Sequence, residues 1–462
     1  MIMLGFGTVG RCALPLLLGR LGIPASRYVV VDGEDQREAA LPYIGAGVEY
    51  IVSPLRRENY ARILSDLARP GDILVNLAVS VKCLDIAEWC QSHGVIYIDT
   101  AFEPWDDDIF EENEPVFQRT IYHYHHAARA MGARWRPGGP TAIFGHGANP
   151  GLATHFMKAA LLEAARVVGD EAQAPATQTE WARLAMRLGV KVVHISERDT
   201  QSSPLPRAPR EFVNTWSIVG FIEEASRPVE LGWGTHETAY PSDAHFHEQG
   251  SKSCLYIPRS SQGFQLRSWV PRSGPIVGIS LPHSETITIS DCLTFKRGDE
   301  VIYRPTVAYV YLPCDAALAS LHETMMLDWE LPSAMRVMST DIQSGADELG
   351  VLLLSERFGG LWYGSYLDID AARKLVPHSN PTAVQVAAGV VSATVWSLKN
   401  GLEGYCEPED LPFQEILETA RPYLGSLRST TTEWNPLKRR RILYGGSLLD
   451  ERQPYVLGNF LV

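Results

Sequence analysis

Three catalytic signatures are absent from this sequence of 462 residues: a G-x-S-x-G nucleophile elbow, a G-x-x-x-x-G-K-[ST] phosphate loop and an H-E-x-x-H zinc motif. Acyl transfer on a serine elbow and phosphoryl transfer on a P-loop are therefore disfavoured. Metalloprotease chemistry is disfavoured for the same reason. Redox chemistry with a nicotinamide stays open, and the motif described below favours it.

Cysteine is scarce, and no two cysteines form a C-x-x-C pair; the seven are Cys12, Cys83, Cys90, Cys254, Cys292, Cys314 and Cys406. An odd set without such pairs is typical of reduced thiols in a cytosolic enzyme and argues against a disulfide framework. No apolar run approaches the roughly 18 residues that span a bilayer. The apolar run over 13–18 also lacks the basic start and cleavage site of a signal peptide. We expect a cytoplasmic protein without membrane contact.

Basic residues are fewer than acidic ones: 41 Lys and Arg face 54 Asp and Glu, a net charge of −13. This balance argues against a nucleic-acid surface and is compatible with a cationic substrate. The basic run Lys438–Arg441 is expected to be a solvated turn. The length and a hydrophobic content of 45% are sufficient for two or three domains with substantial cores.

The sequence does contain a dinucleotide motif, because a short apolar strand runs into G-F-G-T-V-G at Gly5–Gly10. In such a motif Gly5 permits the tight turn, Gly7 lets the backbone approach a pyrophosphate, and Gly10 lets the next helix pack closely. That helix is predicted over Arg11–Arg20, with its N-terminal amides facing the phosphates. Thr8 and Val9 are expected cofactor contacts for the same reason.

An acid follows the second predicted strand, Arg27–Val31, at Asp32. An acid about 20 residues after the glycines is the expected acceptor for the ribose hydroxyls. Because Asp32 would repel a 2′-phosphate, we predict NAD as the cofactor, and not NADP. The alternative is a Gly-rich turn that binds no dinucleotide, and it is disfavoured because strand, glycines, helix and acid occur together.

The order of predicted elements indicates an α/β fold. Strands and helices alternate in the first third, which predicts a doubly wound parallel sheet with strands at Ile2–Gly5, Arg27–Val31, Val48–Ile51, Asp72–Leu77, Val95–Asp99 and Thr141–Phe144. A helix over His155–Val168 should lead into a second domain. This part is β-rich from 190 to 315, with strands predicted at Val190–Ser196, Cys254–Ile257, Leu266–Val270, Glu285–Ile289 and Val307–Leu312. The last hundred residues return to helix, notably Pro381–Leu398.

These elements predict two domains. The first is a Rossmann-type NAD-binding domain over 1–150, which the C-terminal segment 380–462 could complete. The second is an α+β domain over 151–380 for substrate binding and dimerisation. Ligands bind beyond the carboxyl ends of parallel strands, and polar residues gather there in the segments 76–80, 99–105 and 145–151.

Several ionisable residues are candidates for a site in the second domain. Glu197 and Asp199 end an apolar strand, and Trp216 is followed by Glu223 and Glu224. A tryptophan ring with nearby carboxylates can bind an organic cation. The alternatives are ordinary loop acids and a tryptophan that packs in the core.

Histidines offer weaker signals. His283 precedes a predicted strand, where a lone histidine is more often structural than catalytic. The histidines at 123, 125, 126, 245 and 247 raise the possibility of zinc, but they lack the spacing of an open catalytic site. We predict no metal site.

Taken together, many blocks of the chain resemble bacterial homospermidine synthases, a family related to the saccharopine dehydrogenases. The resemblance covers nearly the whole chain. It is carried by the blocks Gly5–Gly10, Tyr97–Thr100, Glu103–Trp105, Gly147–Gly151, Glu180–Met186, Glu197–Gln201, Asn214–Ser217, Glu230–Thr235, Tyr303–Thr306, Asp347–Val351 and Trp362–Ser365.

The resemblance implies a homodimeric enzyme that transfers an aminobutyl group with retained NAD. Putrescine is oxidised to an imine, a second amine displaces ammonia, and the same NADH reduces the new Schiff base to homospermidine. The implied catalytic residues are Trp216, Glu197, Asn149 and His283, and the implied substrate contacts are Glu103, Glu224, Asp347 and Ser80. The implied NAD contacts are Gly5, Gly7, Thr8, Val9, Gly10, Asp32, Asn76, Thr100 and Ala148.

The chain departs from the family pattern at two acids. Ser80 and Val219 stand where the family places carboxylates, and the block ending in His146 also differs. Two lost carboxylates on the path of a dication could redirect the enzyme to another amine, so this alternative is kept. A non-catalytic NAD-binding regulator is a third hypothesis, and the retained Glu197, Trp216 and Asn149 argue against it.

Overall fold

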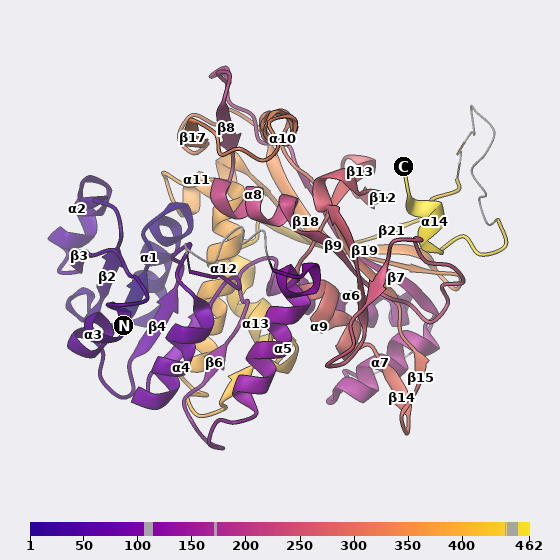
Figure 1. Cartoon of the computed structure of the whole chain (residues 1–462), viewed down its shortest axis with the longest axis horizontal. Coiled ribbons are helices and arrows are strands. Elements are labelled where there is room, and N and C mark those ends of the chain that lie inside the picture. The colour runs from indigo at the N-terminus through magenta and orange to yellow at the C-terminus, as the bar shows by residue number, and fades with distance from the viewer. Residues whose placement is uncertain (106–113, 171–172, 439, 441–450) are drawn as a thin grey trace.

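The computed structural model describes residues 1–105, 114–170, 173–438, 440 and 451–462 of the chain. Two β-sheets organise the molecule, one in each half, and helices cover both (Figure 1). The expected α/β class, with an N-terminal doubly wound sheet and a second α+β domain, is confirmed.

The first sheet has seven strands, in the order β20-β6-β5-β4-β1-β2-β3, and all of its pairings are parallel. The order 3-2-1-4-5-6 is that of a dinucleotide-binding sheet, whose switch point lies between β1 and β4. Its strands are β1 (Ile2–Leu4), β2 (Val29–Asp32), β3 (Glu49–Val52), β4 (Ile73–Asn76), β5 (Ile96–Asp99), β6 (Ala142–Ile143) and β20 (Tyr405–Cys406). The helices between them are α1 (Thr8–Leu21), α2 (Arg37–Gly45), α3 (Tyr60–Leu67), α4 (Cys83–His93) and α5 (Ile121–Gly132).

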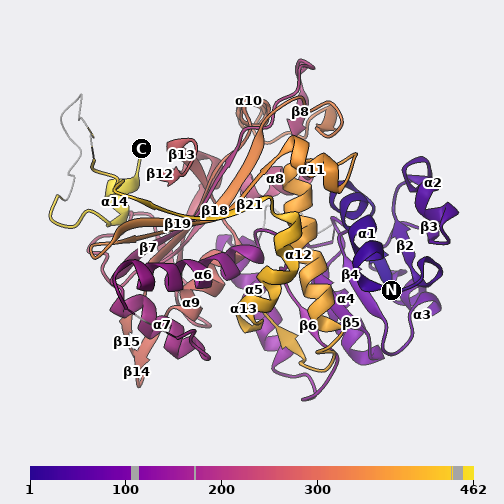
Figure 2. The ribbon, with the colours of Figure 1, turned by 180° about the vertical axis from the view of Figure 1, so that it is seen from behind.

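The C-terminal part of the chain is divided between the two sheets. β20 adds an edge strand to the first sheet, and α12 (Pro381–Ser397) packs against α1 and α13 (Phe413–Ala420). Figure 2 shows α12 and α13 crossing the molecule between the two halves. By contrast, β21 (Ser426–Thr432) is an edge strand of the second sheet, and α14 (Leu457–Phe460) packs on its strand β12.

The second sheet has ten strands. Its main path is β10-β11-β9-β16-β7-β18-β19-β21, and β13 joins it at β16 with β12 alongside. The bounds are β7 (Val190–Asp199), β9 (Pro228–Gly232), β10 (His245–Phe246), β11 (Cys254–Ser260), β12 (Gln265–Val270), β13 (Gly274–Leu281), β16 (Thr306–Leu312), β18 (Ala346–Ser355) and β19 (Gly359–Asp368). Short pairs lie outside it, β14 (Phe295–Arg297) with β15 (Glu300–Tyr303) and β8 (Glu211–Asn214) with β17 (Ala334–Val337). Its helices include α6 (Leu152–Val167), α7 (Gln178–Arg187), α8 (Ile218–Ser226), α9 (Ser284–Cys292), α10 (Asp315–Met326) and α11 (Ile369–Leu375).

One predicted strand is wrong. The segment Glu285–Ile289 alternates β-branched and polar residues, yet it lies inside helix α9. All of its residues are buried, so a two-residue alternation does not mark a solvent-facing side. Hydroxyls along the helix donate back to carbonyls, as Ser290 does to Thr286 at 2.6 Å. The long hairpin β18–β19 also lies beyond the segment that was expected to be β-rich.

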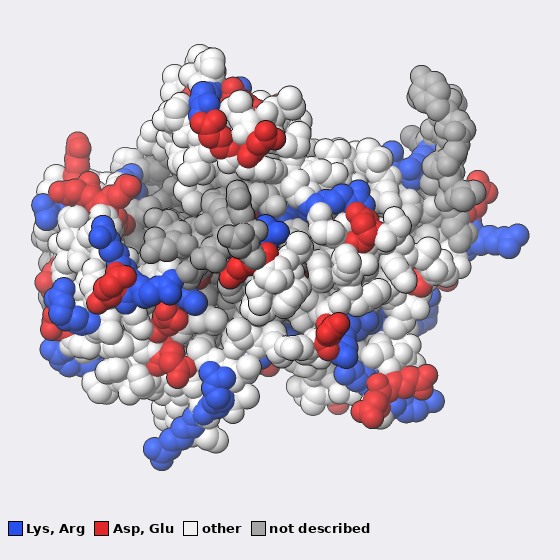
Figure 3. Space-filling view, viewed as in Figure 1, with Lys and Arg blue, Asp and Glu red and all other residues white. Residues whose placement is uncertain are grey.

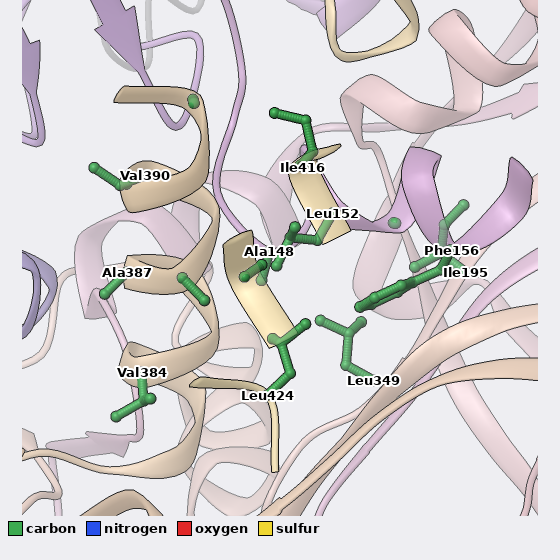
Figure 4. Close-up of a cluster of buried hydrophobic side chains, with 14 of the residues drawn as sticks. Ala148, Leu152, Phe156, Ile195, Leu349, Val384, Ala387, Val390, Ile416 and Leu424 are labelled. Atoms are coloured by element: carbon green, nitrogen blue, oxygen red, sulfur yellow. The ribbon is translucent and has the colours of Figure 1, made fainter. Parts of the chain in front are cut away.

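A continuous hydrophobic core joins the two halves. Figure 4 shows α12 facing α6 and the inner strands β7 and β18. The labelled side chains are Ala148, Leu152, Phe156, Ile195, Leu349, Val384, Ala387, Val390, Ile416 and Leu424, all within this one cluster. Figure 3 shows acidic and basic side chains interspersed over the face of the molecule that is seen in Figure 1. The shared core holds the ends of the parallel strands against the second sheet.

Candidate active site

The glycine loop has the geometry that each of its positions predicts. Gly5 has φ +87°, and a Cβ there would lie 2.6 Å from the carbonyl oxygen of Leu77. A Cβ on Gly10 would collide with the carbonyl oxygen of Gly5, so only glycine lets α1 approach its strand. A Cβ on Gly7 would meet nothing within 4 Å. The open space beside Gly7 is where a pyrophosphate must approach, so the loop fits a dinucleotide.

Asp32 stands at the end of β2 and accepts hydrogen bonds from the backbone. Its Oδ2 accepts from the Phe6 amide in the glycine loop, and its Oδ1 accepts from the Glu34 amide at 2.7 Å. Beside it lies a crevice of about 560 Å³ at the carboxyl ends of β1 to β4. The crevice is lined by Gly5, Val31, Gly33, Ser53, Pro54, Leu55, Arg56, Arg57, Glu58, Ala78, Val79, Ser80, Val81 and Trp105.

A second cavity, of about 150 Å³, adjoins this crevice, since Ala78 and Val79 line both. The first domain contributes strand ends, loops and the carboxylate of Glu103, and the second contributes Glu197, Glu224 and the aromatic rings. Its lining is Val9, Asn76, Leu77, Ala78, Val79, Thr100, Ala101, Glu103, Gly147, Asn149, Pro150, Glu197, Trp216, Ser217, Gly220, Glu224, His283, Tyr309, Thr382 and Val386. All four predicted catalytic residues are brought together here, with Glu103 and Glu224 of the predicted substrate contacts and Val9, Asn76 and Thr100 of the predicted cofactor contacts.

Glu197 is the most tightly held carboxylate of the cavity. Its Oε2 accepts from the Asn149 amide at 2.8 Å and from the Tyr309 hydroxyl at 2.6 Å. Burial and the neighbouring charge of Asp199 raise the pKa of Glu197 above its ordinary range, despite these two donors. A cation arriving beside Glu197 would favour its ionised form.

Trp216 lies just before α8 and forms one wall of the cavity. Its indole Nε1 donates to the Tyr311 hydroxyl at 3.3 Å, and its ring contacts Phe221 at a centroid distance of 5.1 Å. Ser217 caps α8 by accepting from the Gly220 amide at 3.2 Å. The cap and the ring contacts hold the indole in place at the cavity wall.

Two further carboxyls, Glu103 and Glu224, line the cavity. Glu103 accepts from the backbone amide of Ser80 at 3.1 Å, and burial together with the charge of Glu223 raises its pKa to about 8. Glu224, on α8, has its pKa raised to about 7 by burial, against the attraction of His283. These acids therefore bind a proton easily unless a cation replaces it.

His283 is a buried cation among these acids. Its Nδ1 lies 2.5 Å from Oε2 of Glu285, and its Nε2 lies 3.9 Å from Oε1 of Glu224. Burial lowers the pKa of His283, but the charge and hydrogen bond of Glu285, together with the charges of Glu224 and Glu197, outweigh burial and raise it to about 9. The imidazole is therefore protonated at neutral pH.

Besides Gly5, Gly7, Gly10 and Asp32, four predicted residues lie outside the cavity lining. Asp347 is fully buried behind Glu197 and accepts from the Thr382 hydroxyl at 2.6 Å. Ser80 lines the outer crevice, at φ +57°. Thr8 is the first residue of α1, and Ala148 is buried beside Asn149.

The sequence assigned no site role to Glu285, Tyr309 and Thr382, which contact the predicted residues directly. Each lies in an apolar segment that carried no motif, so only the folded arrangement shows its place. The histidines considered for zinc have other contacts: His125 lies within hydrogen-bonding distance of Glu407, at 3.3 Å, and His247 stacks on Tyr122.

The part of the chain that the structure describes contains neither a metal-ligand cluster nor a helix that could cross a membrane. No group of three or more His, Cys, Asp or Glu side chains is arranged there to hold a metal ion. None of the helices there combines the length and the apolar character needed to cross a membrane.

The fold and the crevice define a two-domain enzyme of the saccharopine dehydrogenase class. Two family models match the chain: the saccharopine dehydrogenase NADP binding domain over residues 1–143 and the saccharopine dehydrogenase C-terminal domain over residues 147–432. The dinucleotide domain and the second domain of the structure correspond to these two matches.

More similar relatives identify the family within that class. A homospermidine synthase from Blastochloris viridis is 40% identical over 100% of this chain and 97% of its own length. One from Mesorhizobium japonicum is 36% identical, over 100% of this chain and 96% of its own. The crystal structure of the homospermidine synthase from Legionella pneumophila in complex with NAD superposes with a TM-score of 0.92 at 36% identity, covering 100% of this chain and 97% of that one. The chain belongs to the homospermidine synthase family, which confirms the resemblance seen in the sequence.

Proposed function

We propose that this enzyme makes homospermidine by NAD-dependent aminobutyl transfer. Two putrescines, or spermidine and putrescine, would give homospermidine and ammonia, with no net redox change. One observation carries the proposal: a cavity walled by Trp216 and lined by Glu103, Glu197 and Glu224 adjoins the dinucleotide crevice and shares lining residues with it. Such a cavity suits a diamine held beside a nicotinamide.

NAD is the cofactor that the crevice fits. Gly5, Gly7 and Gly10 would seat the pyrophosphate at the start of α1, and Asp32 would accept the ribose hydroxyls. When bound, NAD supplies a hydride acceptor that later returns the hydride to the substrate carbon. Val9, Asn76 and Thr100 line the cavity where the nicotinamide end would lie.

The side chains of the cavity bind and orient the amine. Glu197 and Glu224 would pair with its ammonium groups, and Glu103 would do so nearer the crevice. The face of Trp216 would stabilise the cationic iminium that forms during the reaction. Because these groups are already held by hydrogen bonds and packing, they need little rearrangement as charge develops.

A nitrogen must lose a proton before hydride can leave the neighbouring carbon, so the cavity also needs a proton acceptor. Glu197, the buried acid with a raised pKa, suits this role. Water must be kept out as well, because it would hydrolyse the imine to an aldehyde. The small volume and the aromatic and proline lining of the cavity favour this exclusion.

The decisive test uses the purified enzyme with its NAD and putrescine deuterated at both carbons that bear nitrogen. We expect homospermidine by mass spectrometry, with the transferred deuterium retained because the same cofactor returns it. A reaction without added NADH should proceed for many turnovers. Absence of bound NAD after gentle purification, together with no homospermidine from putrescine or spermidine, would contradict the proposal.

A second candidate is the same chemistry on a different amine. The observation that favours it is Ser80. This residue lines the dinucleotide crevice, carries a hydroxyl where the family has a carboxylate, and donates its backbone amide to Glu103. Val219 lies on α8 outside the cavity lining. Competition between putrescine and a panel of monoamines, diamines and amino acids, read by mass spectrometry, separates the two: preference for another amine supports the second candidate. The homodimer that the family resemblance implies stays a prediction, to be checked by light scattering.

A further inference from the structure

Three carboxyl groups share one face of the second sheet behind the cavity. β7 and β18 are antiparallel, with Asp199 directly opposite Asp347 and Glu197 directly opposite Leu349. Directly opposed residues of such a pair point to the same side, and so do residues two apart. Glu197, Asp199 and Asp347 are therefore neighbours, and none is more than 3% exposed.

These three carboxyls are unequally supplied with donors. Asp199 accepts from the Gln201 backbone at 2.8 Å, from the Gln201 side chain at 3.0 Å and from the Thr215 hydroxyl at 2.7 Å. Asp347 accepts only from Thr382 on Oδ2, and its buried Oδ1 has no partner among the described residues. Since ionised carboxylates need donors on both oxygens, Asp199 is the one suited to stay charged and Asp347 the one suited to hold a proton.

Asp347 and Glu197 are also close enough to hydrogen-bond to each other. Two carboxylates repel, so that bond forms only when one of them carries a proton. Burial raises the pKa of Asp347, and the charges of Glu197 and Asp199 raise it further. A proton on Asp347 would also give its unpartnered Oδ1 a partner.

Besides the Asn149 amide, the hydroxyl and charged groups that face the pair come from three elements. β16 contributes the hydroxyls of Tyr309 and Tyr311, and α12 contributes the hydroxyl of Thr382. The cation that faces Glu197 is His283, which precedes α9 and is already engaged with Glu285. Glu224 is close enough to Tyr309 to act on its hydroxyl and adds negative charge.

We propose that Glu197 and Asp347 share a single proton before substrate binds, and that this pair exchanges the proton of the reacting nitrogen. In the step, an N–H bond of the substrate ammonium breaks and an O–H bond forms on Glu197, while the proton between the two carboxyls stays on Asp347. The amine is left neutral and the pair carries two protons. The reverse transfer protonates the product amine, so no proton is gained or lost. The proton transfer with the substrate rests on the proposed function, whereas the shared proton of the resting pair does not.

Glu197 lines the cavity, whereas Asp347 does not. Glu197 is therefore the group that touches the substrate, and Asp347 is a positioning residue that acts through it. A neutral Asp347 keeps one negative charge in the pair, enough to attract an ammonium group. It also donates to Glu197, which fixes the oxygen that takes the substrate proton.

The resting state can be tested without substrate. In the enzyme with its NAD, labelled with ¹³C at aspartate side-chain carboxyls, one buried aspartate should remain protonated at pH 7 by NMR. That signal should be missing in Asp347→Asn. The infrared difference spectrum, wild type minus Asp347→Asn, should show a carboxylic-acid band from the same aspartate. If every aspartate of the wild type is ionised at pH 7, the proposal is wrong, and this holds whether or not Asp347→Asn folds.

Kinetics of Asp347→Asn test the role in turnover. An asparagine still donates to Glu197 and keeps the pair's single charge, so KM for putrescine should stay within about threefold. Because asparagine is neutral, like the protonated Asp347, the acid limb of the kcat profile should stay unchanged. The alkaline limb, which in the wild type includes loss of the shared proton, should move up by about one unit. Glu348→Gln is the matched control, because Glu348 is a buried acid on the opposite face of the same strand, bonded to the Arg272 amide at 2.9 Å.

A KM that rises tenfold in Asp347→Asn, with an unmoved pH profile, would mean that Asp347 is ionised and binds substrate directly, which contradicts the proposal. An enzyme that turns over a different amine would contradict only the proposed function. In that case the same variant is measured with that amine, and the NMR result stands unchanged.

Discussion

His283 and Glu285 form a buried ion pair at the edge of the cavity, with 2.5 Å between Nδ1 and Oε2. They lie on either side of Ser284, where the chain turns into α9. The histidine is 6% exposed and the glutamate 1%, so water screens the pair little. The charge of Glu285 keeps His283 protonated, which sets the charge that the cavity presents to a substrate.

This pair makes stability depend on pH. The pKa of His283 is raised from 6.5 to about 9, so its contribution is fully present below pH 6.5 and is lost as the pH rises through 9. Such a shift corresponds to about 3 kcal/mol at most. In Glu285→Gln the stability should be lower at pH 6 and should decline less between pH 6.5 and 9.5.

Chemical denaturation at several pH values measures the difference between the two proteins. His322→Asn serves as the control, because His322 is exposed and its loss should leave the pH dependence unchanged. Parallel curves for the wild type and Glu285→Gln across this range would show that the ion pair does not control the histidine.

Trp216→Ala should slow homospermidine formation at least tenfold, which is about 1.4 kcal/mol of transition-state stabilisation. The loss follows because the ring that faces the cationic intermediate is gone. Trp216→Phe keeps an aromatic face and loses the hydrogen bond to Tyr311, so its rate should lie between those of the wild type and Trp216→Ala. Product is measured by mass spectrometry under saturating putrescine, and wild-type turnover in the alanine variant would refute the assigned role.

Gly7 and Gly10 should respond differently to alanine. At Gly7 a methyl group enters open space, so the fold should keep its stability to within about 0.5 kcal/mol while NAD affinity falls at least tenfold. At Gly10 the methyl group strikes the Gly5 carbonyl, and stability should fall by about 1–3 kcal/mol. Thermal unfolding with and without NAD separates the two effects. Equal NAD affinity in Gly7→Ala and the wild type would place the pyrophosphate elsewhere.

Asp32→Ser combined with Glu34→Arg should shift the preference from NAD toward NADP. The first change removes the charge that repels a 2′-phosphate, and the second adds an exposed cation beside it. Binding of both cofactors is compared by calorimetry, with Glu34→Arg alone as the control. An unchanged preference for NAD in the double variant would count against the ribose contact of Asp32. Asp32 also bonds the Phe6 amide, so some loss of stability is expected in the double variant.

Much of the first domain follows from local sequence. A glycine that needs positive φ, a glycine without room for a Cβ and an acid after the second strand are demands of the backbone itself, and they show in the pattern. Trp216 and Glu197 were recognisable because their segments match the family. By contrast, the helix at Glu285 was predicted as a strand, because fully buried segments show no polar face and their periodicity is misleading.

The sequence alone was therefore enough for the fold class, the dinucleotide loop and the family, since these depend on short-range spacing and local conformation. Which acids meet was decided only by the tertiary structure. The register of β7 against β18 brings Asp347 to Glu197 and Asp199, and α12 brings Thr382 to the same place. Such contacts join residues far apart in the chain, and they arise from packing that no local pattern encodes.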